Sequence, residues 1–83
     1  MNNLRLIPGA IFRHYKNKDY LIVGVAKHTE TLEDLVVYRS LYKSEPNSGF
    51  NDYQMWTRPK DMFTETVVID GVERPRFEFV CQS

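Results

Sequence analysis

The side chains best suited to chemistry lie in two groups, and the first is the segment His28-Thr29-Glu30-Thr31. A histidine titrates near neutral pH, so His28 could act as a general base with Glu30 as its carboxylate partner. A nucleophile triad would take its hydroxyl from Thr29 or Thr31. Neighbouring residues on a strand point to opposite faces, however, which makes that triad a poor candidate. The simpler interpretation of His28 is a strand-end residue followed by a helix cap.

The second group consists of arginines that stand beside aromatic residues. Arg58 follows Trp56 by two positions, and Arg76 directly precedes Phe77. Arginine in such surroundings can stack on a base, or can bind a carboxylate or phosphate through two parallel hydrogen bonds. The alternative is a structural ion pair of either arginine with Glu30, Glu33 or Asp34. The candidate ligand-binding residues are therefore His28, Glu30, Trp56, Arg58 and Arg76, followed by Arg13 and His14.

Aromatic residues make up 13% of the chain and can serve either a core or a recognition surface. The residues expected in the core are Phe12, Tyr20, Phe63 and Phe77. Those with a polar group or a place near a loop are Tyr15, Tyr38, Tyr42, Tyr53 and Trp56. An exposed cluster of the second set would suit proline-rich peptides or stacked bases.

Composition excludes several classes of protein. Two histidines and one cysteine form no metal-ligand spacing, and no glycine-rich phosphate loop or dinucleotide fingerprint is present, so no metal and no cofactor is expected. Eleven basic and eleven acidic residues balance, which argues against a strongly basic nucleic-acid protein and an acidic disordered tail. Residues 1–28 carry five basic residues against one acidic residue, so the N-terminal hairpin is expected to present a mildly positive face unless the acidic remainder pairs with it.

The compartment is inferred from cysteine use and hydropathy. Cys81 is the only cysteine, so no internal disulfide can form, and a reducing cytoplasm is the natural environment. The N-terminus lacks the pattern of a signal peptide. The longest apolar run, residues 20–26, is far shorter than the roughly 20 residues of a membrane span. We expect a cytoplasmic protein without membrane contact.

Strand patterns dominate the chain. They cover residues 10–15, 20–26, 35–42, 53–58, 64–69 and 76–80. Gly24 within the second run predicts a bulge or a close backbone approach, and Asp70-Gly71 predicts a tight hairpin. One or two short helical turns are expected, at residues 59–63 and 29–34. Five to six short strands in 83 residues predict one all-β domain over residues 1–83, a small, strongly bent barrel rather than a two-sheet sandwich.

A set of motifs spread along the chain resembles the bacterial domain of unknown function 1653 (DUF1653) family over about residues 9–79. The motifs are Phe12-Arg13-His14-Tyr15-Lys16, residues 24–33, Leu35-Val36-Val37-Tyr38, Leu41-Tyr42, Trp56-Thr57-Arg58-Pro59, Met62-Phe63 and Pro75-Arg76-Phe77. The resemblance implies an SH3-like β-barrel and brings no established activity. Asn17 stands where this family often has glycine, and asparagine also tolerates a left-handed turn. The loop over residues 43–52 is longer than is typical of the family, which leaves its role open.

Three functions follow as hypotheses. The first is a non-enzymatic binding module for a small anionic or nucleotide-like ligand, a nucleic acid or a peptide. The second is an enzyme or enzyme-accessory domain, which requires His28 and Glu30 to meet in a concave pocket with a perturbed histidine pKa. The third is a structural module that forms a homodimer. The sequence leaves the partner open and allows either a monomer or a homodimer.

Overall fold

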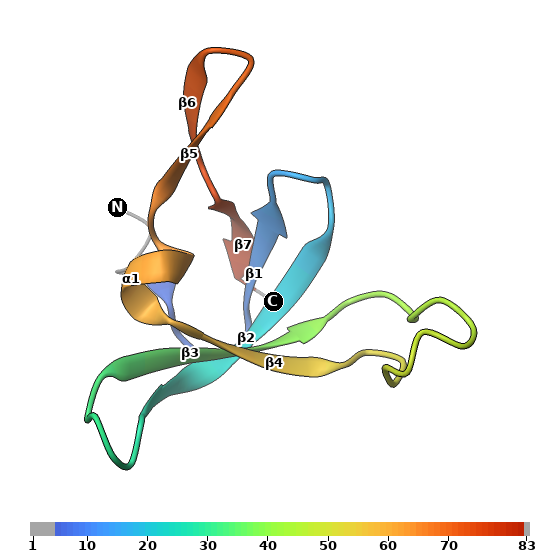
Figure 1. Cartoon of the computed structure of the whole chain (residues 1–83), viewed down its shortest axis with the longest axis vertical. Coiled ribbons are helices and arrows are strands. Elements are labelled where there is room, and N and C mark those ends of the chain that lie inside the picture. The colour runs from blue at the N-terminus through green and yellow to red at the C-terminus, as the bar shows by residue number, and fades with distance from the viewer. Residues whose placement is uncertain (1–4, 83) are drawn as a thin grey trace.

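The chain folds into seven β-strands and one short helix, which a computed structural model describes for residues 5–82 (Figure 1). The elements are β1 (Ala10–His14), β2 (Asp19–Lys27), β3 (Asp34–Ser40), β4 (Met55–Pro59), α1 (Lys60–Phe63), β5 (Thr66–Ile69), β6 (Val72–Pro75) and β7 (Phe77–Gln82). The all-β prediction is confirmed. The sequence predicted five or six strands, and the structure has one more, because the residues after the Asp70-Gly71 turn pair with β5 before the last strand begins.

Five of the strands form one antiparallel sheet in the order β4-β3-β2-β1-β7, and β5 pairs with β6 in a separate hairpin. The sheet is a meander whose last strand returns to lie beside the first, which is the strand order of an SH3-like barrel. In Figure 1 the sheet bends so that β3 and β4 run across the direction of β1 and β7, while the β5–β6 hairpin projects away from it. The only described helix has four residues, so no described helix is long and apolar enough to cross a membrane.

Two bulges produce the bend. The pairing of β2 with β3 shifts register between Ile22 and Gly24, and the pairing of β1 with β7 shifts between Ile11 and Phe12. A bulge bends its strand and increases the local twist. A Cβ added to Gly24 would meet no atom within 4 Å. The structure therefore has the predicted bulge at Gly24 and not the alternative, a close backbone approach.

The tight turns use the residues that their backbone angles require. Asn17, between β1 and β2, has a φ of 66°, so asparagine does hold the left-handed position expected of it. Asp70 and Gly71 both have positive φ, as a two-residue hairpin turn demands. Pro59 precedes α1 and ends β4, as predicted. Residues 29–34, by contrast, contain no helix: residues 29–33 form a turn and Asp34 begins β3.

The core is built from aromatic and branched side chains on the inner face of the bent sheet. The buried hydrophobic residues are Leu6, Ala10, Phe12, Ile22, Val36, Tyr38, Phe63 and Phe77. Helix α1 delivers Phe63, whose ring stacks on Phe77 with centroids 4.0 Å apart. Burial of one such side chain is worth about 1.5–3 kcal/mol. Phe12, Phe63 and Phe77 are thus core residues as predicted, whereas Tyr20 is only half-buried and packs against the core.

Strand alternation extends this inner face beyond the core. Val36, Tyr38 and Ser40 alternate along β3 and are all buried. In the register of β3 with β4, Tyr38 lies opposite Trp56 and Val36 lies opposite Arg58. Directly opposed residues share a face of the sheet. Trp56 and Arg58 therefore point to the same side as the core, at the point where the core ends.

Candidate functional site

The inner face of the sheet opens into a small pocket next to the core. Tyr20 of β2, Tyr38 of β3, and Trp56 and Arg58 of β4 line a volume of about 180 Å³, which we call the arginine pocket. Three of its four walls are aromatic, and the fourth carries a positive charge. Aromatic walls and one cation are suited to a flat or anionic ligand group.

Arg58 is the charged group of this pocket. Its guanidinium carbon lies 5.6 Å from the centroid of the Phe77 ring, within the range of a cation–π contact. Among residues 5–82, no carboxylate forms an ion pair with Arg58, and no acceptor takes a hydrogen bond from its side chain. The five N–H donors of the guanidinium thus remain available to an anion.

Trp56 is fixed in place by a hydrogen bond. Its Nε1–H donates to the Oγ of Ser40 at 2.9 Å, and Ser40 is only 1% exposed. The indole has no second N–H, so Trp56 can offer a ligand its ring face only. The ring also contacts Phe50, with centroids 5.1 Å apart and planes tilted by 60°.

Two tyrosine hydroxyls meet at the rim of the arginine pocket. The hydroxyls of Tyr20 and Tyr42 are 2.7 Å apart. Burial, and then the hydrogen bond to Tyr42, raise the pKa of Tyr20 well above its ordinary value of 10.0. Tyr20 therefore stays protonated at neutral pH. In a pair of hydroxyls one proton forms the mutual hydrogen bond and the other is left to donate.

Arg76 forms an ion pair, but with a partner that the sequence did not indicate. Its Nη2 donates to the Oε1 of Glu65, which precedes β5, and its backbone N–H donates to the Glu65 carbonyl at 3.0 Å. The acids proposed as partners, Glu30, Glu33 and Asp34, lie elsewhere, and Asp34 pairs with Lys27 at 2.8 Å. The Nε of Arg76 is buried and has no hydrogen-bond partner among the described residues.

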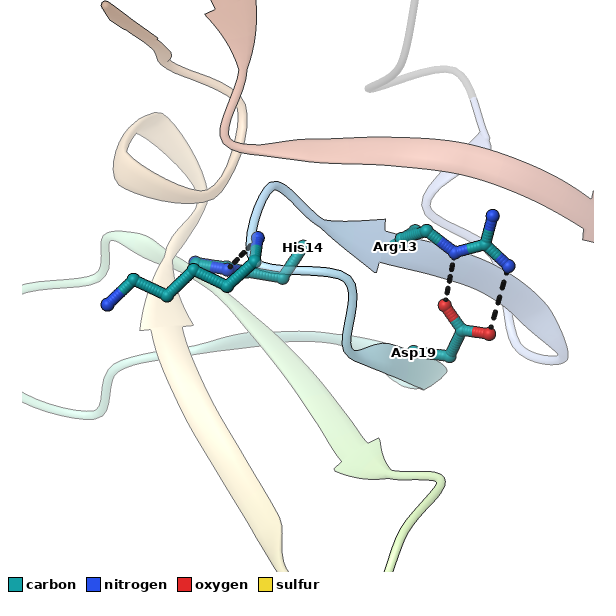
Figure 2. A network of polar contacts seen from close by, with 4 residues as sticks. Arg13, His14 and Asp19 are labelled. Carbon is teal, nitrogen blue, oxygen red and sulfur yellow. Dashed lines mark hydrogen bonds and ion pairs between the residues drawn. The ribbon is translucent and has the colours of Figure 1, made fainter. Parts of the chain in front are cut away.

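His14 lies beside both arginines. Its ring packs edge-on against Phe77 with centroids 4.9 Å apart, and its Nδ1 accepts a hydrogen bond from the backbone N–H of Lys16 (dashed in Figure 2). Burial lowers the pKa of His14, and the positive charges of Arg58, Arg76 and Lys16 lower it further. The lowered pKa of His14 thus indicates that the surroundings of Phe77 are positively charged.

Arg13 points away from this neighbourhood. It follows Phe12 on β1, so its side chain lies on the outer face of the sheet and is 51% exposed. Its guanidinium turns toward the carboxylate of Asp19 on the neighbouring strand, with contacts of 2.8 and 3.3 Å (Figure 2). The carboxylate raises the pKa of Arg13. Arg13 is therefore already paired within its own hairpin.

His28 and Glu30 form the turn between β2 and β3. The Nδ1 of His28 accepts hydrogen bonds from the backbone N–H groups of Glu30, at 3.1 Å, and Thr31, at 3.3 Å. His28 thus caps the turn itself, and no helix follows it. The Glu30 backbone, and not its carboxylate, contacts the imidazole. The side-chain pair that an acid–base mechanism requires is not formed here.

Four of the seven predicted site residues therefore gather around Phe77 and the arginine pocket. They are His14, Trp56, Arg58 and Arg76. The other three lie in the β2–β3 turn or on the outer face. Sequence reasoning missed Tyr20, which was assigned to the core, and Ser40, which orients Trp56. The alternation of Val36, Tyr38 and Ser40 was visible in the sequence, but the register that sets Tyr38 beside Trp56 was not.

No group of three histidine, cysteine, aspartate or glutamate side chains within residues 5–82 has the arrangement of a metal site. Cys81 is exposed and has a free thiol.

Comparison with known proteins matches the chain to one family and to a solved structure. Residues 10–79 match the family described as "Protein of unknown function (DUF1653)". A crystal structure of a protein belonging to the same family, from Bordetella bronchiseptica, matches with a TM-score of 0.75 and 37% sequence identity. The match covers 92% of this chain and 88% of that one. No functionally curated protein matches the chain.

Proposed function

The chain belongs to the DUF1653 family of proteins of unknown function, and from this premise we propose that it is a non-enzymatic module that binds a small anionic or nucleotide-like ligand. The ligand occupies the arginine pocket. Arg58 binds the anionic group, Trp56 and Tyr38 offer ring faces, and Tyr20 stands at the rim. Behind the pocket lie His14, whose pKa is lowered, and Arg76, which is paired with Glu65.

The observation that carries the proposal is the unpaired guanidinium of Arg58. The cations of the ion pairs within residues 5–82 are Arg13, Lys27 and Arg76, so Arg58 takes part in none of these pairs. Arg58 is half-buried among aromatic rings, where water solvates it less well than at the open surface. A cation in such a place without an acidic partner is a ready binding site for an anion, which gains more from the contact than it would in open water.

Further positive charge lies on the same side. Lys16 and Lys18 belong to the β1–β2 turn and make no ion pair with a described residue. The Nζ of Lys18 lies 4.7 Å from the ring centroid of Tyr42, whose hydroxyl meets that of Tyr20. This agrees with the positive face expected of the N-terminal hairpin, and it favours an anion over a neutral ligand.

The acid–base alternative loses its support because the imidazole of His28 is used to cap a turn. Homodimerisation keeps one observation in its favour: the apolar side chains of Val68 and Val72 are exposed on the projecting β5–β6 hairpin. A single exposed hairpin favours no particular partner. We regard ligand binding as the better supported function.

The domain organisation and the cellular compartment are further parts of the proposal. We propose that residues 1–83 act as one SH3-like domain in the bacterial cytoplasm, where the exposed thiol of Cys81 stays reduced. A single cooperative urea transition, followed by tryptophan fluorescence and by circular dichroism, tests the single domain. Two separate transitions would contradict it.

The test of function is an amide NMR titration of the labelled protein. The panel contains inorganic phosphate, mononucleotides, short single-stranded RNA and DNA, a proline-rich peptide and common anionic metabolites. The expected result is a set of shifts at Trp56, Arg58, Arg76 and His14 with the phosphate-bearing compounds. Arg58→Gln should weaken this binding by about tenfold or more, because a hydrogen bond to a charged group contributes about 1.5–3 kcal/mol.

The matched control is Arg39→Gln. Arg39 lies on β3 next to Tyr38 but on the exposed outer face, so its loss removes the same charge without altering the pocket. Equal weakening by both variants would show a general charge effect. The absence of shifts with every compound, or shifts that Arg58→Gln leaves unchanged, would refute the proposed site.

A further inference from the structure

A second pocket lies beside the first and shares a wall with it. The long loop between β3 and β4, residues 41–54, folds over a volume of about 360 Å³, which we call the loop pocket. Its lining includes Lys18, Tyr42, Lys43, Phe50 and Trp56. Trp56 also lines the arginine pocket, and the hydrogen-bonded hydroxyls of Tyr42 and Tyr20 join the two walls. The pockets are therefore neighbouring parts of one surface.

The loop pocket is shaped to receive a flat ring. Phe50 lies against Trp56 but is 55% exposed, an unusual position for a phenylalanine. The loop holds Phe50 there by its own hydrogen bonds: the backbone N–H of Phe50 donates to Ser48 Oγ at 3.3 Å, and that of Asn51 donates to Gln54 Oε1 at 2.9 Å. Two adjoining aromatic faces that stay partly exposed are suited to stacking with a planar group of a ligand.

Size and charge assign different roles to the two pockets. The loop pocket falls within the range of about 300–1,000 Å³ that is usual for small-molecule sites, whereas the arginine pocket is smaller and suits one compact group. Arg58 supplies the cation of the smaller pocket. Lys18 and Lys43 stand at the larger one, where Glu45 is the single acidic residue of the lining. A ligand complementary to both joins a compact anion to a flat, largely apolar ring.

We propose that the two pockets together bind a mononucleotide, with its phosphate at Arg58 and its base at Phe50, Trp56 and Tyr42. This inference rests on the function proposed above and adds Phe50 as the residue that selects for a base. The hydrogen-bonded hydroxyls of Tyr20 and Tyr42 join the two pockets, and the hydroxyl proton that their mutual bond does not use can be donated to a phosphate oxygen.

The test compares ligands that contain one end of a nucleotide with ligands that contain both. Inorganic phosphate, ribose 5-phosphate, adenosine and adenosine monophosphate are titrated into the full chain, with calorimetry for affinity and NMR for location. The nucleotide should bind about tenfold or more tightly than ribose 5-phosphate, because stacking of a base on aromatic rings adds to the binding of the phosphate. The added shifts should fall in residues 41–54.

Phe50→Ala should lower the affinity for the nucleotide toward that for ribose 5-phosphate, because one of the three stacking rings is lost, while the affinity for inorganic phosphate stays unchanged. Tyr53→Asn is the matched control, since Tyr53 is an exposed aromatic residue of the same loop, outside the pocket lining, and asparagine tolerates its φ of 53°. It should leave nucleotide binding unchanged. An unchanged melting temperature for both variants shows that the fold is intact.

Three outcomes would overturn the inference. If nucleotide and ribose 5-phosphate bind equally while phosphate still perturbs Arg58, the base site is refuted and the proposed anion site stands. If no anion perturbs Arg58, the proposed function fails and this inference fails with it. If a single-stranded oligonucleotide binds more than tenfold more tightly than the mononucleotide, the ligand is a nucleic acid strand and not a free nucleotide.

Discussion

The arginine pocket and the β2–β3 turn each contain polar side chains that the sequence offered as site residues, and the two regions differ in how those side chains are used. At the turn, both available hydrogen-bonding partners of the His28 Nδ1 are backbone N–H groups of the turn itself, and Asp34 next to it is paired with Lys27. At the pocket, Arg58 has no acidic partner among the described residues, and the Trp56 ring keeps part of its face exposed. The polar groups named in the turn are already hydrogen-bonded or ion-paired, whereas the guanidinium of Arg58 remains available to a ligand.

The difference shows what distinguishes a structural polar group from a functional one in a small domain. A polar side chain whose partners belong to its own turn stabilises that turn and has little left for a ligand. A charged side chain without a partner in the fold, by contrast, can form charge-assisted hydrogen bonds with another molecule, and exposed rings beside it can add further contacts. Residue type alone does not separate the two cases.

The largest expected effect comes from reversing the charge at the pocket. Arg58→Glu should reduce the affinity for phosphate compounds by more than about a hundredfold, because it removes a charge-assisted contact and adds repulsion between like charges. Glu30→Gln at the turn should leave the affinity unchanged. Isothermal titration calorimetry of both variants checks this, and a comparable loss from Glu30→Gln would remove the distinction between the two regions.

The next effect concerns the bond that fixes Trp56. Trp56→Phe and Ser40→Ala each remove the hydrogen bond between Nε1 and Oγ, so a double-mutant cycle should give a coupling of about 1 kcal/mol in the free energy of unfolding. Urea denaturation of the two single variants and the double variant measures it. Strict additivity would mean that the bond does not hold the indole in place.

A smaller effect is expected at the turn. His28→Ala should lower the free energy of unfolding by about 0.5–1 kcal/mol, because two backbone N–H groups lose the acceptor that caps them. His28→Asn should restore most of that loss, since asparagine offers an acceptor to neighbouring N–H groups. Neither variant should alter phosphate binding. A binding defect without a stability defect would make His28 a ligand residue after all.

The smallest effect is the pH dependence contributed by His14. Its pKa in the folded chain lies below its ordinary value of 6.5, so the unfolded chain takes up the proton more readily. The contribution of His14 to stability is therefore complete above pH 6.5 and decreases as the pH falls from 6.5 through the lowered folded pKa. Urea unfolding of the wild type and His14→Gln at pH 7.5 and pH 5 should show a smaller drop for the variant. An equal drop would place the cause elsewhere.

Much of the fold follows from local patterns. Asn17, Gly24 and Asp70-Gly71 each specify a turn or bulge through backbone chemistry that involves only near neighbours. The alternation along β3 likewise puts Val36, Tyr38 and Ser40 on one face, because side chains on a strand alternate whatever surrounds them. The buried rings Phe12, Phe63 and Phe77 were expected in the core because large aromatic side chains fill the core of a small domain.

The site needed information that no local pattern contains. The pairing that sets Tyr38 beside Trp56 joins strands separated by a 14-residue loop, residues 41–54, and its register depends on which hydrophobic face the whole sheet buries. The partner of Arg76 proved to be Glu65, which reaches it because the β5–β6 hairpin folds back. The sequence proposed three other acids, all in or beside the β2–β3 turn.

The sequence by itself thus determined most of the strands and tight turns, an irregularity at Gly24 and the residue types that a site would use, because each depends on interactions within a few residues. The tertiary structure alone decided which of those residues already have a hydrogen-bond or ion-pair partner within the protein. It paired Arg13 with Asp19 and used His28 to cap a turn. It placed Arg58 beside Tyr20, Tyr38 and Trp56 with no acidic partner from residues 5–82. That allocation depends on contacts between strands far apart in the chain, where geometry and not residue type sets which groups meet.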